Sequence, residues 1–334
     1  MRRRPAVRAL AGLAAAALGV LLVACGSLRL GPNDAAGGAL ARVADLGGAS
    51  YVVAGGTTTE VRVLCQLTIA ALQAAGARAT DQCGKVGSVD VRRPARQTEV
   101  DTAWIYLGRP DRGGGDPSSV LPAPLRPPDP SGSARPGDPA EAARADAALG
   151  VTRLAPAAFG DVDAVVVGPA LAGVGTVSGL ADRLRLPGAE PLCATPEATA
   201  DPGRLPALLE VYRPSTEVRV LDSGAVFGAV ATGGCAAGLV PGTSGRIPAL
   251  ALTVLADDRG ALARGPTGRG GAVPVLRTPV LAAHPQVAPV LATMTARLDD
   301  AALRSINRDV DQDGRDPRDA ARRWLLAQGL IDRT

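Results

Sequence analysis

The sequence of 334 residues predicts an α/β protein with two lobes, each a sheet flanked by helices. Strand-like and helix-like segments alternate between residues 50 and 107, and again between 162 and 276. A segment dominated by Pro and Gly, residues 109–137, separates the two blocks. The last segment, 278–328, is purely helical, and we expect its helices to return to the first lobe. We therefore expect a clamshell architecture, in which two lobes are joined by a hinge.

The first lobe is expected to begin with a strand at residues 50–54, closed by Gly55-Gly56. A helix then starts near Thr57–Glu60, because hydroxyl residues followed by an acid are typical of a helix N-terminus. Apolar residues continue at helical spacing as far as Gly76, which ends this helix. The other elements expected here are strands at 77–82 and about 100–107, and a helix at 138–149.

The second lobe and the C-terminal segment are interpreted in the same way. Val162–Val167 is an apolar run of strand length, and Ser223–Thr232 is a helix closed by Gly233-Gly234. We expect further strands at 217–221, 250–255 and 272–276, a helix that ends at 207–212, and C-terminal helices at 278–283, 286–298, 300–309 and 316–328.

The N-terminus has the pattern of an export signal. Arg2–Arg8 is a positive region, and Ala9–Ala24 is a mostly apolar run of 16 residues, shorter than the roughly 20 that span a bilayer. The run ends in Leu22-Val23-Ala24-Cys25-Gly26, which resembles the lipobox of bacterial lipoproteins. We therefore expect a diacyl anchor on Cys25 that holds the protein on the extracytoplasmic face of the cell membrane. The alternative is an ordinary secretory peptide that is cut elsewhere.

These observations divide the chain into six parts, with the folded part beginning at Ser50. The parts are a lipoprotein signal peptide at 1–24, a tether at 25–48, the first part of lobe 1 at 49–108, a Pro/Gly-rich insertion and helix at 109–150, lobe 2 at 151–262, and the return strand and C-terminal helices of lobe 1 at 263–334.

Charge and histidine content exclude several classes of function. The net charge of +4 comes from the four arginines of the export signal, so the mature chain is neutral. A neutral chain has no general field that attracts nucleic acid, and we expect no such partner. The sequence holds one histidine, which argues against metal sites and histidine-based acid–base catalysis. We expect no enzyme activity, no metal and no cofactor.

Four cysteines remain once Cys25 is set aside: Cys65, Cys83, Cys193 and Cys235. An even number in an exported protein indicates disulfides, and three pairings are possible. The order of the elements favours the local pairs Cys65–Cys83 and Cys193–Cys235. Free buried thiols are the alternative. A zinc site is disfavoured, because the sequence has no CxxC pair with a neighbouring histidine.

A series of short motifs matches a known family. The motifs are Thr59-Glu60, Glu99-Val100-Asp101, Val254-Leu255-Ala256-Asp257-Asp258, Val273-Pro274-Val275-Leu276-Arg277, Ile306-Asn307, Val310-Asp311, Gly314, Asp316-Pro317, Trp324-Leu325 and Gly329-Leu330. With them, residues 50–331 resemble the substrate-binding proteins of ABC importers for glycine betaine, choline and similar osmoprotectants. The resemblance implies a type II periplasmic-binding-protein fold, in which two lobes close over a ligand.

The family holds a quaternary ammonium in a cage of aromatic rings, because a cation without N–H groups is bound by ring faces. Matched by position, the family's tyrosines and early lysine are here Ala103, Tyr106, Asp163, Phe227, Gly270 and Gly56, with Trp104 beside the first. The resemblance therefore implies that most of the cage is missing from this chain.

Most candidate ligand residues have a structural alternative. Trp104 and Tyr106 face the same side of a strand, where a core role is equally open. Asp163, an acid in an apolar run, is either a carboxylate that holds a cationic ligand or a solvent-facing residue at a strand edge. The three threonines at 57–59 either bind an anion or cap the helix. The candidate set is Tyr106, Trp104, Asp163, Asp161, Phe227, Thr57, Thr58, Thr59, Thr243 and Ser244.

The function expected from these observations is that of a monomeric, extracytoplasmic solute-binding lipoprotein of an ABC importer. It would bind a small polar or cationic solute and deliver it to permease subunits in the membrane. The alternative is a repurposed surface lipoprotein of the same fold, whose ligand site has decayed and which acts in interaction or sensing.

Cys25→Ala should abolish lipid attachment, because the acylated thiol is then absent. Metabolic labelling with a fatty-acid analogue, followed by recovery of the protein from the bacterial membrane, measures this. Equal labelling of the variant and the wild type would contradict the assignment of Cys25 as the lipidated residue.

Overall fold

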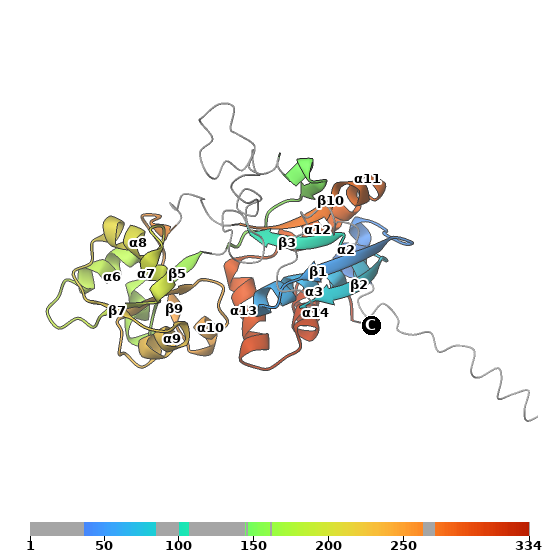
Figure 1. Cartoon of the computed structure of the whole chain (residues 1–334). Helices are drawn as coiled ribbons and strands as arrows, with labels where there is room; N and C mark the ends of the chain where they lie inside the picture. The colour runs from blue at the N-terminus through green and yellow to red at the C-terminus, as the bar shows by residue number, and fades with distance from the viewer. Residues whose placement is uncertain are drawn as a thin grey trace, which may run out of the picture. The chain divides into compact units, whose positions relative to one another are not determined.

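The computed structural model describes residues 37–84, 100–106, 144, 146–160, 162–262 and 271–333 (Figure 1). Cys25 and the export signal, the whole Pro/Gly-rich segment 109–137, Asp161 and Gly270 lie outside the described residues. Ala35–Thr334 forms one compact unit. No helix within the described ranges is long and apolar enough to span a membrane.

The first sheet has five strands in the order β2-β1-β3-β10-β4. β1 (Ser50–Gly55) lies between β2 (Arg78–Cys83) and β3 (Thr102–Tyr106) and runs parallel to both. β10 (Ala272–Arg277) is antiparallel to β3 and to β4 (Val151–Arg153). A strand from far along the chain therefore completes this sheet, which with its helices we call lobe 1.

The second sheet repeats the same strand plan in the order β7-β6-β8-β5-β9. β6 (Leu192–Ala194) lies between β7 (Val218–Val220) and β8 (Ala237–Pro241) and runs parallel to both. β5 (Asp163–Val167) is antiparallel to β8 and to β9 (Thr253–Val254). This sheet with its helices is lobe 2. The predicted α/β fold of two lobes, each a sheet flanked by helices, is confirmed.

The chain passes between the sheets twice, from β4 to β5 and from β9 to β10. The two passages lie side by side, because Gly160 and Gly271 form an antiparallel bridge. The amide of Ala272 also donates to the carbonyl of Phe159 at 3.4 Å. Paired connecting strands of this kind are where a hinge between lobes is expected.

The second passage is fixed to lobe 2 at its start. The Asp257 carboxylate accepts hydrogen bonds from the amides of Ala261 and Leu262, each at 2.9 Å, and from the Tyr212 hydroxyl at 2.5 Å. Burial, and then this bond to Asp257, raise the pKa of Tyr212 well above its ordinary value. The phenol therefore stays protonated and continues to donate, so the chain is held to lobe 2 as far as Leu262.

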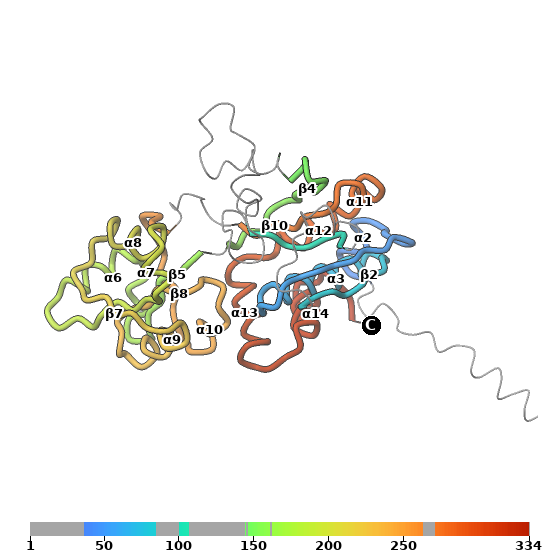
Figure 2. Tube along the Cα trace, viewed as in Figure 1, coloured from blue at the N-terminus to red at the C-terminus, as the bar shows by residue number. Residues whose placement is uncertain are grey.

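The C-terminal helices pack on lobe 1, as the sequence predicts. Three of them contact α3 (Thr59–Ala74), and Leu64 and Leu67 of α3 share one hydrophobic core with Leu291 and Leu325. Figure 2 shows the last two of these helices, in red, beside the blue β1–α3 segment. The helices are α11 (Thr278–Ala283), α12 (Val287–Thr295), α13 (Asp300–Asp311) and α14 (Pro317–Ala327).

The packed structure begins earlier than the sequence predicts. α2 (Gly38–Val43) precedes Ser50, and the amides of Ala39 and Leu40 donate to the carbonyls of Gly329 and Leu330 at 3.2 and 3.0 Å. Leu40 is fully buried. Part of the segment predicted to be a tether is therefore packed against the C-terminal end of the chain.

Helices cover both faces of the second sheet, and the side chains of β5 alternate between them. Val165 and Val167 join one core and Val166 joins the other. A Cβ placed on Gly238 of β8 would lie 2.8 Å from Val226, so glycine permits the close approach of a helix here. The helices are η3 (Pro169–Val174), α6 (Val177–Arg183), α7 (Pro196–Ala200), α8 (Leu205–Tyr212), α9 (Ser223–Ala231) and α10 (Arg246–Ala249).

Both local disulfides are present, and each lies within one lobe. Cys65 of α3 joins Cys83 at the end of β2, with the Cα atoms 5.8 Å apart. Cys193 of β6 joins Cys235, just before β8, with the Cα atoms 5.9 Å apart. Neither bond connects the two lobes, so neither restrains their relative movement.

Replacing one disulfide by two alanines should destabilise its own lobe. The closed loops span 18 and 42 residues, which on the loop-entropy model corresponds to about 3 kcal/mol for Cys65–Cys83 and about 4 kcal/mol for Cys193–Cys235. Denaturant unfolding of the two double variants measures this. Non-reducing peptide maps that join Cys65 or Cys83 to Cys193 or Cys235 would contradict the pairing.

Candidate functional site

The site is built around Glu60, in the first turn of α3. Thr58 precedes the helix in an extended conformation, and its carbonyl accepts the Arg62 amide at 3.0 Å. An acid in the first turn is stabilised by the free amides and the dipole of the helix. The short connection from Gly55 of β1 to the helix therefore brings a carboxylate to the carboxyl end of the parallel strands.

The Glu60 carboxylate accepts hydrogen bonds from elements of both lobes. The hydroxyl of Tyr106, at the end of β3, donates to Oε1. The hydroxyl of Thr243, in the turn after β8, donates to Oε2, and Nδ2 of Asn307 in α13 lies 3.4 Å from the same oxygen. We call these four residues the Glu60 cluster. Hydrogen bonds to an ionised acceptor are stronger than those between neutral groups.

The amide of Asn307 is fixed within the cluster. Its Nδ2 also donates to the Thr243 carbonyl at 2.9 Å, so both neighbours of that nitrogen are acceptors. This assigns the nitrogen and the oxygen of the amide. Its Oδ1 is buried and has no hydrogen-bond partner among the described residues. The cluster thus presents a carboxylate and an amide oxygen, both of which accept N–H donors.

All three candidate aromatic rings lie within hydrophobic cores. Trp104 is 5% exposed, its indole N–H donates to the Thr68 hydroxyl at 2.9 Å, and its ring lies 6.1 Å from that of Phe159. Phe227 is 2% exposed in the core under α9, with the Arg246 guanidinium 5.7 Å from its ring centroid. Tyr106 is 5% exposed and belongs to the same core as Trp104, and it is the candidate ring whose hydroxyl reaches Glu60.

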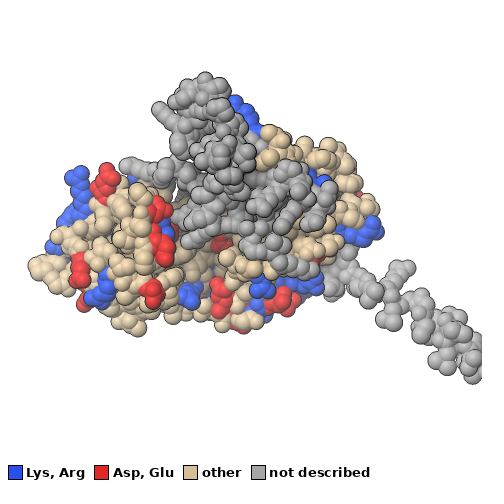
Figure 3. Space-filling model, viewed as in Figure 1, with Lys and Arg blue, Asp and Glu red and all other residues tan. Residues whose placement is uncertain are grey.

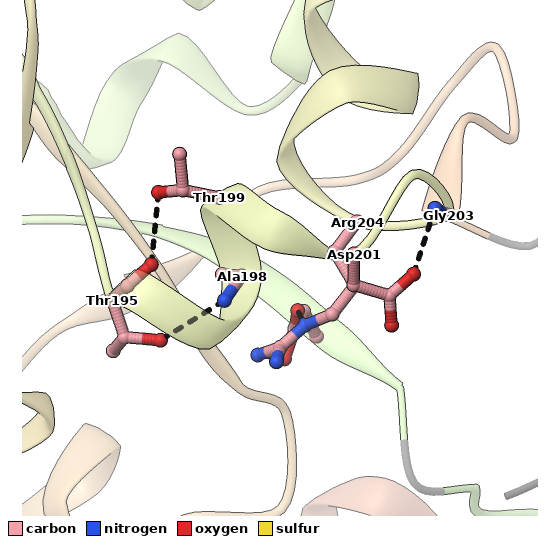
Figure 4. Close-up of polar contacts among 7 residues, drawn as sticks. Thr195, Ala198, Thr199, Asp201, Gly203 and Arg204 are labelled. Carbon is pink, nitrogen blue, oxygen red and sulfur yellow. Dashed lines mark hydrogen bonds and ion pairs between the residues drawn. The ribbon is translucent and has the colours of Figure 1, made fainter.

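Asp163 is paired within lobe 2. Its carboxylate, at the start of β5, accepts two hydrogen bonds from the Arg204 guanidinium, one of them 2.8 Å from Nη2 to Oδ1. Both side chains are buried, which excludes the solvent-facing alternative. The turn that carries Arg204 is held by the Gly203 amide, which donates to Asp201 at 2.9 Å, and it follows the short helix that Thr195 caps (Figure 4).

The remaining candidates lie near the ends of helices. Thr57 and Thr58 are exposed, and the Thr58 hydroxyl makes no cap bond to α3. The Thr59 hydroxyl donates to Asp311 of α13 at 2.7 Å. Ser244 follows Thr243, and its hydroxyl oxygen accepts the Arg246 amide at 3.3 Å at the start of α10. Of the candidate set, therefore, Tyr106 and Thr243 meet at Glu60, and Thr59 is its neighbour.

The comparison with protein families decides the class. The profile of the family described as the substrate-binding domain of ABC-type glycine betaine transport systems matches residues 49–327. The chain belongs to this family. It is a substrate-binding protein of the glycine betaine/choline type of ABC importer, a class of protein that works outside the cytoplasm.

Individual relatives agree with this family. The glycine-betaine-binding protein of Pseudomonas aeruginosa is 29% identical over 292 residues, which cover 84% of this chain and 88% of that protein. Apo YehZ from Escherichia coli is 22% identical with a TM-score of 0.67, over 84% of this chain and 99% of its own. A glycine betaine/carnitine/choline ABC transporter structure is 19% identical with a TM-score of 0.63, over 85% and 99%. The two structures share the fold of this family member.

Two residues of the Glu60 cluster are absent from the sequence-predicted set. Glu60 and Asn307 belong to motifs that carry the family resemblance, Thr59-Glu60 and Ile306-Asn307. The sequence did contain a signal for them, because each motif holds a polar residue whose presence no predicted helix, strand or turn explains. Glu60 and Asn307 are 247 residues apart in the sequence, and the packing of α13 against α3 brings them together.

Arg204→Met should destabilise lobe 2 by about 3–5 kcal/mol, because it leaves the Asp163 charge buried without its partner. The matched control is Arg185→Met, which removes the exposed pair with Asp182 and should cost about 0.5 kcal/mol or less. Denaturant unfolding of both variants measures the difference. Equal, small losses would show that Asp163 does not depend on Arg204.

Proposed function

We propose that this protein is a lipid-anchored receptor that delivers a small polar or cationic solute bearing N–H groups, rather than a quaternary amine, to an ABC permease. The observation that carries the proposal is the Glu60 cluster, a carboxylate that accepts hydrogen bonds from both lobes. Anchoring through Cys25 is the part of the proposal that rests on the sequence alone.

The burial of the rings argues against a quaternary amine. Such a cation donates no hydrogen bond and depends on ring faces, each worth up to ~2 kcal/mol when desolvated. The rings of Tyr106, Trp104 and Phe227 are all enclosed in hydrophobic cores. The other cage positions, Ala103, Asp163 and Gly270, lack a ring. The loss of two or three such contacts costs about 4–6 kcal/mol, which is roughly three to four orders of magnitude in affinity.

The polar groups of the cluster favour a ligand that donates hydrogen bonds. A carboxylate forms its strongest contacts with charged N–H donors, such as a primary or secondary ammonium. The Asn307 Oδ1 adds a buried acceptor, which costs free energy until it is paired. We propose Glu60, Tyr106, Thr243 and Asn307 as ligand-binding residues. Asp163 is proposed to organise lobe 2, because Arg204 already balances its charge.

The charge distribution favours a small solute over a polyanion. On the face shown in Figure 3, basic and acidic side chains are interspersed rather than gathered by sign. A surface of this kind creates no extended positive field for nucleic acid or another polyanion.

The proposal predicts an order of affinities within one methylation series: glycine betaine, N,N-dimethylglycine, sarcosine and glycine. Glycine betaine should bind at least tenfold more weakly than the best of the other three, because only those offer N–H groups to Glu60. Titration calorimetry on residues 35–334, which form one compact unit, measures all four.

Tyr106→Phe and Tyr106→Leu are the matched controls, since the first keeps the ring and the second removes it. Micromolar glycine betaine binding that survives Tyr106→Phe and is lost in Tyr106→Leu would show a working aromatic cage and contradict the proposal. The absence of binding for the whole series and for a wider set of polar solutes would favour the repurposed surface lipoprotein.

A further inference from the structure

The turn after β8, residues 242–245, is seated on α13 of the other lobe. The Gly242 carbonyl accepts a hydrogen bond from the Arg304 guanidinium at 2.6 Å. The Thr243 carbonyl accepts the Asn307 amide at 2.9 Å, and the Thr243 hydroxyl donates to Glu60. Side chains of lobe 1 therefore satisfy two successive carbonyls of a lobe 2 turn.

Gly245 brings the two backbones into direct contact. A Cβ placed on it would lie 2.4 Å from the backbone nitrogen of Arg308 and 2.6 Å from the carbonyl carbon of Asn307. Its φ of −62° and ψ of −18° are ordinary helical values that any residue adopts. Glycine is thus required by the approach of α13 and not by the local conformation.

α13 is a firm support for this turn. The Asp299 carboxylate caps the helix through the Ala302 amide at 2.7 Å, and Leu303 and Ile306 are buried in the core of lobe 1. Arg304 and Asn307, three residues apart, share the neighbouring face and meet the turn. The position of α13 is therefore set by lobe 1, whereas the turn is set by β8.

We propose that the 242–245 turn and α13 form a latch that holds the two lobes together, and that Gly245 is the residue that allows it to close. The covalent connections between the lobes are the two strands that meet at Gly160 and Gly271. Contacts between domains joined in this way are small, polar and reversible. The latch uses the protein's own atoms, so its closed form is populated without added solute. This goes beyond the proposed solute class and does not depend on it.

Gly245→Ala tests the latch with a single methyl group. Because the helical backbone at 245 accepts alanine, lobe 2 should fold normally, and the three atoms nearest to the new methyl group all belong to α13. Small-angle X-ray scattering of the protein without added solute should show a larger radius of gyration than the wild type. The matched control is Gly228→Ala in α9, where a Cβ would have no atom within 4 Å and the radius should stay unchanged.

Arg304→Met keeps the stem of the side chain and removes the bond to Gly242, so it should expand the protein as well. Arg297→Met, at an exposed position just before α13, is its control. If Gly245→Ala fails to fold by circular dichroism, the arginine pair decides the outcome. Scattering curves of Arg304→Met, or of a folded Gly245→Ala, that superimpose on the wild-type curve would overturn the proposal. Equal expansion by a control variant would also overturn it.

Any effect on solute binding is a separate readout. If the latch stabilises the binding-competent arrangement, the apparent affinity for sarcosine should fall at least tenfold in Gly245→Ala and stay constant in Gly228→Ala. Failure of sarcosine to bind the wild type would contradict the proposed solute class. The latch would then be tested by the scattering result alone. Unchanged sarcosine affinity in Gly245→Ala, in a wild type that binds it, would contradict the link between latch and binding.

Discussion

The Glu60 carboxylate is the point on which both lobes converge. A half-buried carboxylate loses hydration and needs several donors in return, and here they come from β3, from α13 and from the turn after β8. The donors are contributed by residues up to 247 positions away from it along the chain. Each of these elements must therefore be in place before the carboxylate is satisfied, which couples the fold of each lobe to the contact between them.

The rest of lobe 1 serves to hold α3 at the right place. The Cys65–Cys83 bond joins this helix to β2, and a Cβ on Gly55 would lie 2.9 Å from the Cβ of Cys65. The strand, the helix and the disulfide thus approach one another closely near the first turns of α3, which carry Glu60. Leu64 and Leu67 of α3 are buried in the same hydrophobic core as residues of α12 and α14. Apolar burial stabilises the fold of lobe 1, and the polar Glu60 cluster makes the contact between the lobes specific.

The α/β class, the return of the C-terminal helices and both disulfide pairs follow from the sequence, because periodicity and local cysteine spacing are short-range signals. β6 and β8 escaped prediction, since three-residue and glycine-containing strands have little alternation. The strand expected at 250–255 is reduced to Thr253–Val254, because Leu250 is the C-cap of α10 and Ala251 has a positive φ. The pairing of Asp163 with Arg204, 41 residues away, and the burial of Trp104 are set by tertiary packing, which no local pattern reports.

The link between the lobes at Glu60 depends most directly on the hydrogen bond that the Thr243 hydroxyl donates to this carboxylate. A double-mutant cycle with Glu60→Gln and Thr243→Val, read as the free energy of unfolding, isolates this pair. We predict a coupling energy of about 1–3 kcal/mol, as for a hydrogen bond to a charged group. Additive effects, with a coupling energy below about 0.5 kcal/mol, would contradict the claim that Glu60 joins the two lobes.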